Sequence, residues 1–254
     1  MGPTSEPYSS KSAIPHVLTV EEIKDIVQKF ADAAHRAVEA GYDFIQIHGA
    51  HGFLIHEFLS PLSNTRTDEY GGSFENRTRF LKEIVTAIRK VIPEGMPLFV
   101  RLSMSDFVES STWDIPEVEK LSVELINDYG VDMVNYSSGG LSYLQKLPRE
   151  WDFQLTMADR IKKDIGIPCS AVGGVCDAAT ASRVVDEMGM EFVEIGKAAM
   201  RHAFNPRSIA VDLNVFCGLL ASCCSSQFLR IENNCAGHQL FLLIRNIAMF
   251  VEYA

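Results

Sequence analysis

The sequence lacks an excess of basic residues. Its 254 residues include 33 acidic and 23 basic side chains, which gives a formal net charge of −10. A surface of this sign repels the phosphate backbone of nucleic acids and the head groups of anionic lipids. We therefore expect neither nucleic acid nor a membrane as a partner.

The sequence also lacks the patterns that mark secretion and membrane insertion. Its first ten residues are polar and show no basic stretch followed by an apolar core, so no secretory signal is visible. Gly2 fails the myristoylation pattern because position 6 is a glutamate. The apolar run from Leu240 to Val251 is interrupted by Arg245 and Asn246 and is too short to span a bilayer.

Paired cysteines are missing as well. The six cysteines stand at positions 169, 176, 217, 223, 224 and 235, without Cys-x-x-Cys spacing or nearby histidines in ligand register. This pattern favours reduced thiols and a cytoplasmic protein. No metal site is expected from it.

The sequence does contain an alternation of amphipathic helices and short apolar strands. Thr19 and Glu22 form a capping box, and apolar residues then recur at helical spacing until Gly41 ends the helix. Five helix–strand pairs predict a parallel sheet with right-handed crossovers. After the first strand at 44–47, helices are expected near 76–92, 116–129, 154–165 and 178–188, and strands at 97–102, 131–136, 168–172 and 191–195.

Each predicted strand is followed by residues suited to chemistry. In a (β/α)8 barrel the functional side chains sit at the carboxyl ends of the strands. The pattern therefore favours a barrel over an open doubly wound sheet, which has the same rhythm. In chain order these residues are His48 and His51, Arg101, Ser137 to Gly140, Gly173 with Gly174, and Gly196 with Lys197.

The segment His48-Gly-Ala-His51 lies on the turn that leaves the first strand. Two imidazoles there can donate hydrogen bonds to one carbonyl oxygen and stabilise the negative charge that grows on it. The alternatives are a zinc pair, as in a zinc-dependent barrel hydrolase, or a structural histidine bonded to the backbone. His56, on the following helix, is interpreted as an ordinary polar helix residue.

Arg101 ends an otherwise apolar strand, and its permanent charge needs an anionic or polar partner inside a barrel. A reduced flavin is one such partner, and a barrel carboxylate is the alternative. At the last two strand ends, glycines precede helices, where exposed backbone N–H groups and a neighbouring lysine would form a phosphate cradle. The residues of this predicted cradle are Gly173, Gly174, Gly196 and Lys197.

Outside the helix–strand pairs stand a long polar loop and a divergent tail. The loop at 60–77 is rich in turn formers and is either an ordered lid or a packing loop. From residue 213 the rhythm is lost, and the run from Leu240 to Val251 is interpreted as a helix of unknown docking or as sequence foreign to the domain. We therefore expect an N-terminal loop at 1–18, a partial barrel at 19–212 and a tail at 213–254.

The polar loop, joined to Ile47-His48-Gly-Ala-His51-Gly52 before it, resembles the old yellow enzyme family of FMN-dependent ene reductases. The resemblance extends from about Ser12 to about Pro206. Its His-x-x-His pair is similar to the subclass related to bacterial xenobiotic reductases. Because the resemblance begins just before the family's fourth strand, it implies an N-terminally truncated, incomplete TIM barrel consisting of about the last five β/α units.

The resemblance implies that NAD(P)H reduces bound FMN and that the flavin passes hydride to the β-carbon of an enone. His48 and His51 would hold the substrate carbonyl, and Arg101 would contact the pyrimidine edge of the flavin. The backbone of the two glycine turns would bind the FMN phosphate, through Gly173, Gly174, Gly196 and Lys197. By analogy, a small-molecule enone of secondary metabolism is the expected substrate.

Three departures separate the chain from the family pattern. Phe53 replaces the tyrosine that is the family's expected proton donor, and Lys197 replaces an arginine. Strands one to three, with a glutamine that pairs with the flavin pyrimidine ring, have no counterpart. An isomerase on the same scaffold, or a non-catalytic remnant that acts as an interaction partner without flavin, are the alternatives. The expected protein partners are a second copy of this chain in a homo-oligomer or a complementing chain that supplies the missing strands.

Overall fold

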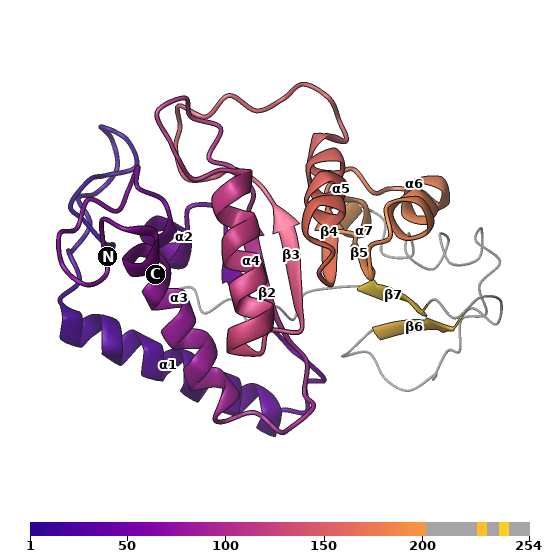
Figure 1. The fold of residues 1–254 in the computed structure, drawn as a ribbon, viewed down its shortest axis with the longest axis horizontal. Helices are drawn as coiled ribbons and strands as arrows, with labels where there is room; N and C mark the ends of the chain where they lie inside the picture. The colour runs from indigo at the N-terminus through magenta and orange to yellow at the C-terminus, as the bar shows by residue number, and fades with distance from the viewer. Residues whose placement is uncertain (202–227, 233–238, 244–254) are drawn as a thin grey trace. The chain divides into compact units, whose positions relative to one another are not determined.

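The structure, a computed structural model, describes residues 1–201, 228–232 and 239–243. The chain forms two compact units, the first from Met1 to Pro148 and the second from Arg149 to Asn246. Each unit alternates helices with strands, as the sequence predicts (Figure 1). No helix among the described residues is both long and apolar enough to cross a membrane.

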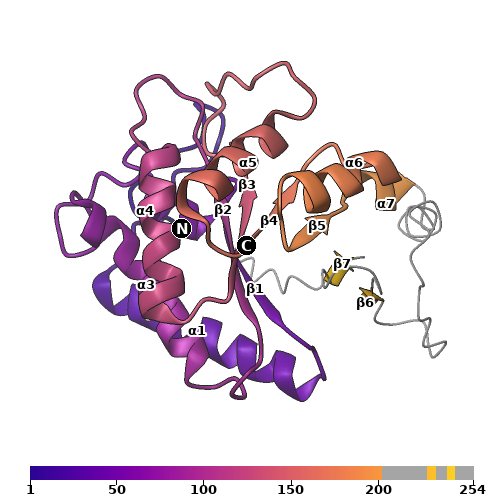
Figure 2. The ribbon, with the colours of Figure 1, turned by 45° about the vertical axis from the view of Figure 1, so that its right-hand side comes forward.

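The first unit is built on three parallel strands that neighbour one another in chain order. Helices α1, α3 and α4 form a layer along one side of these strands in both views (Figure 1, Figure 2). The elements are α1 (Val20–Glu39), β1 (Ile45–Gly49), α2 (Leu54–Leu59), α3 (Phe74–Arg89), β2 (Leu98–Ser103), α4 (Ile115–Tyr129) and β3 (Met133–Ser137).

The capping box at the start of α1 is confirmed. The Thr19 hydroxyl accepts the Glu22 N–H at 3.2 Å, and the Glu22 carboxylate accepts the Thr19 N–H at 2.8 Å. These two bonds satisfy donors that the first turn leaves without helical partners. The apolar face of α1, with Ile23 and Ile26 among its buried residues, packs against α3.

The polar loop at 60–77 is held in place by buried hydrogen bonds. The Asn64 side-chain amide donates to the carbonyls of Phe58 and Tyr70, each at 2.7 Å. Tyr70 is fully buried, and its hydroxyl donates to Glu83 Oε2 at 2.9 Å. Of the two alternatives that the sequence left open, the structure favours the packing loop over the lid.

The same loop also ties down the first residues of the chain. One nitrogen of the Arg66 guanidinium donates to the carbonyl of Leu18 at 2.6 Å and to that of Pro3 at 3.1 Å, and another lies 2.5 Å from the Asp68 carboxylate. Loop and N-terminal segment therefore form one hydrogen-bonded layer within the first unit.

The second unit begins with α5 (Phe153–Ile165) and β4 (Cys169–Val172) and continues with α6 (Ala178–Ser182), β5 (Phe192–Glu194) and α7 (Lys197–Arg201). Strands β4 and β5 are parallel neighbours. The helix expected over 178–188 differs in its second half, where η1 (Arg183–Glu187) is a π-helical turn. There the Met188 N–H bonds to the Arg183 carbonyl five residues back.

The predicted tail contributes two strands to this unit, β6 (Phe228–Glu232) and β7 (Gln239–Leu243). They are antiparallel to each other, and β7 runs parallel to β5. The interpretation of 240–251 as a helix is thus wrong for residues 240–243, and residues 244–251 lie outside the described residues. A short apolar run fits a strand as well as a helix, and here the edge of β5 offers a hydrogen-bonding partner.

Candidate active site

The parallel register of the first unit places three polar residues in one row. His48 of β1 is the Cα partner of Arg101 of β2, which is in turn the partner of Asn135 of β3. In β1 and β2 every residue is buried except His48 and Arg101, which are partly exposed. Side chains at the same level of neighbouring strands point to the same face of a sheet. The row therefore presents an imidazole, a guanidinium and an amide on one face.

His51 joins this row from the turn after β1. Its Nε2 atom lies 2.5 Å from Ser137 Oγ, and its ring centroid lies 5.0 Å from that of His48 at an interplanar angle of 69°. The structure thus brings the two histidines of the predicted carbonyl clamp together.

Both histidines are neutral at pH 7. Burial, with a smaller contribution from the positive charge of Arg101, lowers the pKa of His48 to about 3 and that of His51 to about 4. A neutral imidazole keeps one N–H donor and carries no charge of its own. The pair can therefore donate to an oxygen that becomes negative while it remains uncharged itself.

Phe53 lies beside this pair. Its ring centroid is 5.0 Å from that of His48, and the residue is 41% exposed. Phe53 stands at the position where the family resemblance implies a tyrosine. Its ring lies beside the histidine pair but has no hydroxyl proton to donate to a substrate.

Asn135 is a site residue that the sequence reasoning missed. It is fully buried, and its Oδ1 accepts a hydrogen bond from Arg101 Nε. Because the amide is neutral, this contact orients the guanidinium without neutralising its charge. An asparagine in the middle of a fully buried strand was the available signal.

His56 corrects a second expectation. It is fully buried rather than an ordinary polar helix residue, and its Nδ1 accepts the Gly52 N–H at 3.0 Å. Its Nε2 lies 3.0 Å from Oδ1 of Asp106, which is also fully buried and which the sequence reasoning missed. The helical spacing gave no signal for this pair, since Asp106 comes from the segment after β2.

The second unit holds the residues predicted to bind phosphate. Gly173 and Gly174 have φ values of +123° and +71°, and a Cβ atom there would lie 2.3 Å from Gln154 Nε2 and 2.7 Å from the Trp151 ring, respectively. These glycines therefore admit close neighbours within the second unit. Helix α6 starts further along, and its N-cap Asp177 accepts the Thr180 N–H at 2.8 Å.

Gly196 and Lys197 differ from the first glycine pair. Both are exposed, Lys197 is the first residue of α7, and a Cβ atom at Gly196 would meet no atom of the described residues within 4 Å.

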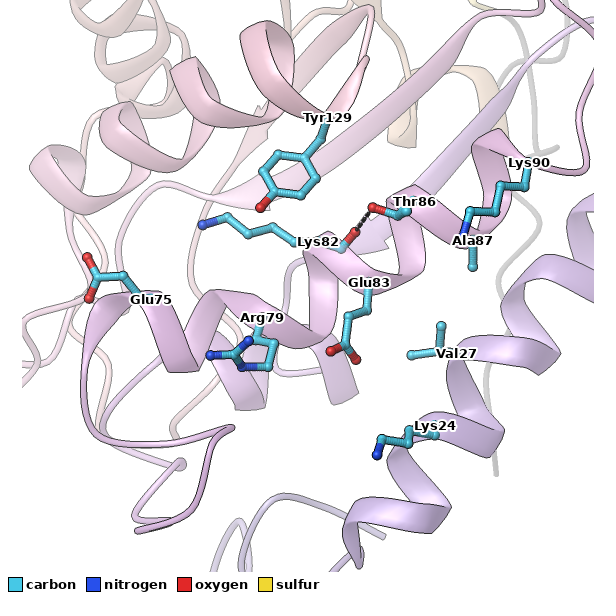
Figure 3. A pocket seen from close by; sticks show the side chains of 10 residues that line it. All are labelled: Lys24, Val27, Glu75, Arg79, Lys82, Glu83, Thr86, Ala87, Lys90 and Tyr129. Carbon is cyan, nitrogen blue, oxygen red and sulfur yellow. Dashed lines mark hydrogen bonds between the residues drawn. The ribbon is translucent and has the colours of Figure 1, made fainter.

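A groove of about 550 Å³ lies elsewhere, on the outer helical layer between α1, α3 and the end of α4 (Figure 3). Within it the Thr86 hydroxyl donates a hydrogen bond to the Lys82 carbonyl at 2.8 Å. None of the residues of the row formed by His48, Arg101 and Asn135 lines this groove. Its position separates it from the candidate site. It is lined by Lys24, Val27, Glu75, Arg79, Lys82, Glu83, Thr86, Ala87, Lys90 and Tyr129.

The zinc alternative gains no support from the geometry. Across residues 1–201 and the two described tail strands, no group of three or more His, Cys, Asp or Glu side chains converges as metal ligands would. His51 instead contacts a serine hydroxyl.

Parallel strands with outer helices, and polar side chains at the strand ends, define the class of α/β-barrel proteins. The sequence model of the NADH:flavin oxidoreductase / NADH oxidase family matches residues 2–215, and the chain belongs to this family. The resemblance to the old yellow enzymes is thereby confirmed.

Individual relatives agree with this assignment. NADPH dehydrogenase of Bacillus pumilus is 41% identical over 215 residues, which cover 84% of this chain and 62% of the relative. NADPH dehydrogenase of Clostridium acetobutylicum is 38% identical over 206 residues, which cover 80% and 59%. The chain thus spans about three fifths of the length of these curated relatives.

Solved structures support the fold. A complex of 2-naphthoyl-CoA reductase with 2-naphthoyl-CoA aligns with a TM-score of 0.74 at 27% identity, over 83% of this chain and 33% of that chain. A morphinone reductase variant in complex with tetrahydroNAD aligns with a TM-score of 0.66 at 25% identity, over 84% and 59%. The expected fold, an incomplete TIM barrel, is confirmed.

The family implies FMN as cofactor, and the donor set of the chain fits this group. In the first unit, a guanidinium held by a neutral amide lies beside two neutral imidazoles. A cation suits the electron-rich pyrimidine edge of a reduced flavin. In the second unit, the exposed turn at Gly196 and Lys197 presents a positive charge to solvent, as a phosphate site requires.

Proposed function

We propose that this chain forms the substrate-binding and phosphate-binding part of an FMN-dependent oxidoreductase that uses NAD(P)H to reduce an activated alkene. The observation that carries the proposal is the strand-end cluster in the first unit, where His48, His51 and Arg101 lie together. FMN, when bound, accepts hydride from NAD(P)H and donates it to the β-carbon of the alkene.

The residues of the chain bind and orient in this proposal. His48 and His51 donate hydrogen bonds to the substrate carbonyl, and their neutrality at pH 7 follows from the low pKa values that burial gives them. Arg101, oriented by Asn135, binds the flavin pyrimidine edge. Gly173, Gly174, Gly196 and Lys197 bind the FMN phosphate.

A conjugated carbonyl compound is the proposed substrate class. Morphinone and 2-naphthoyl-CoA, the compounds named for two structural neighbours, both carry a carbonyl conjugated to an unsaturated system. A carbonyl oxygen between two imidazole donors would gain negative charge as hydride arrives. A substrate from secondary metabolism fits this class.

Isomerisation on the same scaffold is the second candidate, and Phe53 is the observation that favours it. Without a proton donor beside His48, the enolate formed when the β-carbon accepts hydride would be able to rotate about its new single bond and give the hydride back, which would change the geometry of the alkene with no net reduction. Product analysis distinguishes the two, because isomerisation consumes no NAD(P)H.

The test is FMN binding followed by the two half-reactions. Purified chain, alone and completed by the missing part of a relative's barrel, should quench FMN fluorescence, and NADPH should bleach the bound flavin. A simple enone such as 2-cyclohexenone should then restore the flavin colour. Arg101→Leu should weaken FMN binding, whereas Arg160→Leu, which removes an exposed ion pair with Asp164, should not. Absence of FMN binding in both forms would contradict the proposal.

A further inference from the structure

Two peptide groups flank His51, and a side chain holds each of them. The His51 N–H donates to Ser103 Oγ at 3.0 Å, and the Gly52 N–H donates to His56 Nδ1 at 3.0 Å. These two peptide planes fix the backbone angles of His51, whose φ is +59°. A histidine pays a steric penalty in this left-handed region, so the turn needs restraints from its surroundings.

The fold leaves little room for the turn to relax on its other side. A Cβ atom at Gly140 would lie 2.5 Å from the His51 Cα, so the Gly139–Gly140 turn after β3 is in close contact with the histidine backbone. Ser103 Oγ also donates to the Gly139 carbonyl at 3.0 Å. The turn carrying His51 is thus held between Ser103, Gly140 and His56.

Asp106 in turn determines what His56 can do. Because His56 Nδ1 accepts the Gly52 N–H, the ring proton is on Nε2, which lies 3.0 Å from Asp106 Oδ1. The other oxygen, Oδ2, accepts hydrogen bonds from the hydroxyls of Ser60 at 2.6 Å and Ser111 at 2.5 Å. A buried carboxylate opposite Nε2 selects the tautomer that leaves Nδ1 as an acceptor.

We propose that His56 and Asp106 are positioning residues that hold the His51–Gly52 turn, so that the His51 imidazole faces Ser137 and the row of His48. Asp106 selects the His56 tautomer, and His56 fixes the Gly52 peptide. The effect of this turn on substrate binding rests on the proposed function. The contacts that hold the turn do not depend on that function.

Two substitutions separate the contacts of His56. Asparagine places an oxygen where Nδ1 lies and can still accept the Gly52 N–H, whereas glutamine reaches the position of Nε2 and can only donate toward Asp106. Imidazole ¹⁵N spectra of the full chain report the tautomer and pKa of His51 without flavin or substrate. Failure of the proposed function would therefore leave this test intact.

We expect His56→Asn to keep the His51 spectrum and its low pKa. His56→Gln should release the turn and raise the His51 pKa by about one unit or more, toward the value near 6.5 of a solvated histidine. Phe58→Leu is the matched control, because Phe58 is a fully buried ring on the same helix α2. It should weaken packing and leave His51 unchanged.

Asp106→Asn provides a second, nearly isosteric test. The Ser60 and Ser111 hydroxyls would hold the amide oxygen at the Oδ2 position, so the NH₂ group would face His56 Nε2. Nε2 would then become the acceptor, and the proton would move to Nδ1, where it opposes the Gly52 N–H. We expect the ¹⁵N shifts of His56 to become those of the tautomer protonated on Nδ1, and the ¹⁵N shifts of His51 to change as well.

The proposal is overturned by unchanged His51 resonances in both His56→Gln and Asp106→Asn. It is also overturned if Phe58→Leu shifts His51 as much as they do, because the effect would then be general loosening.

Discussion

At the scale of single residues, Phe53 marks the point where this chain departs most clearly from a complete ene reductase. If FMN binds, Phe53→Tyr should speed enone reduction by about 10²-fold, the lower end of what general acid catalysis contributes. Flavin reduction by NAD(P)H needs no proton donor there and should stay nearly the same. Stopped-flow traces of the two half-reactions measure both, and equal rates of flavin reoxidation in the two proteins would show that another acid supplies the proton.

The contact between Gly140 and the His51 turn can be tested through stability. Gly140 has φ +95° and no room for a Cβ atom, so Gly140→Ala should lower the free energy of unfolding by about 2–4 kcal/mol. Gly95 has φ +80° with no atom within 4 Å of a Cβ, so Gly95→Ala should cost only about 1 kcal/mol. Urea unfolding of both variants gives the comparison. Equal losses would mean that the contact is not tight.

Glu57 gives the fold a pH dependence of its own. Burial raises its pKa from 4.5 to about 7, so its protonated form stabilises the folded state. This contribution is fully present below pH 4.5 and is lost as the pH rises through 7. The reason is that between these two pH values the folded state still holds a proton that the unfolded state has already released.

Glu57→Gln should therefore gain stability relative to the unmodified chain between pH 4.5 and 8. We expect about 2 kcal/mol, less than the full shift allows because the side chain is partly exposed. Urea unfolding of both proteins at each pH measures the difference. His48 and His51 titrate in both proteins and cancel. A difference that does not change with pH would argue against a raised pKa.

At the scale of elements, the loop at 60–77 joins the first residues of the chain to the helical layer. Arg66→Ala removes two charge-assisted hydrogen bonds to backbone carbonyls and should cost about 1–3 kcal/mol. Hydrogen exchange should increase first in the segment from Pro3 to Leu18. Arg160→Ala, which breaks an exposed pair on α5, should change stability by less than about 0.5 kcal/mol. Comparable losses in both variants would contradict this role for the loop.

Elements also show where local sequence was sufficient. The capping box at Thr19 and the apolar stripe of α1 placed the helix within a residue of its observed start, because capping and periodicity act over one or two turns. The π-helical turn after Ser182 was missed. Its pattern of apolar residues is compatible with an uninterrupted helix.

At the scale of the whole molecule, pairing of β7 with β5 gives the tail a role in the second unit. Deletion of residues 214–254 would leave the β5 edge without this partner, so we expect a lower melting temperature and more aggregation. Deletion of residues 244–254 alone keeps β6 and β7 and should have the smaller effect. Differential scanning fluorimetry with light scattering measures both. Equal behaviour of the two truncated chains and the full chain would make the pairing irrelevant to stability.

The sequence by itself determined the first five strands and the helices that precede them, apart from the π-helical turn, together with the parallel barrel class and the strand-end residues His48, His51 and Arg101. These features depend on local periodicity and on the rule that parallel strands end at one edge. Only the tertiary structure decided that Asn135 orients Arg101, 34 residues away in the chain, and that Asp106 lies against His56. Such contacts depend on strand register and on the path of a loop, and both are set by packing between segments distant in sequence.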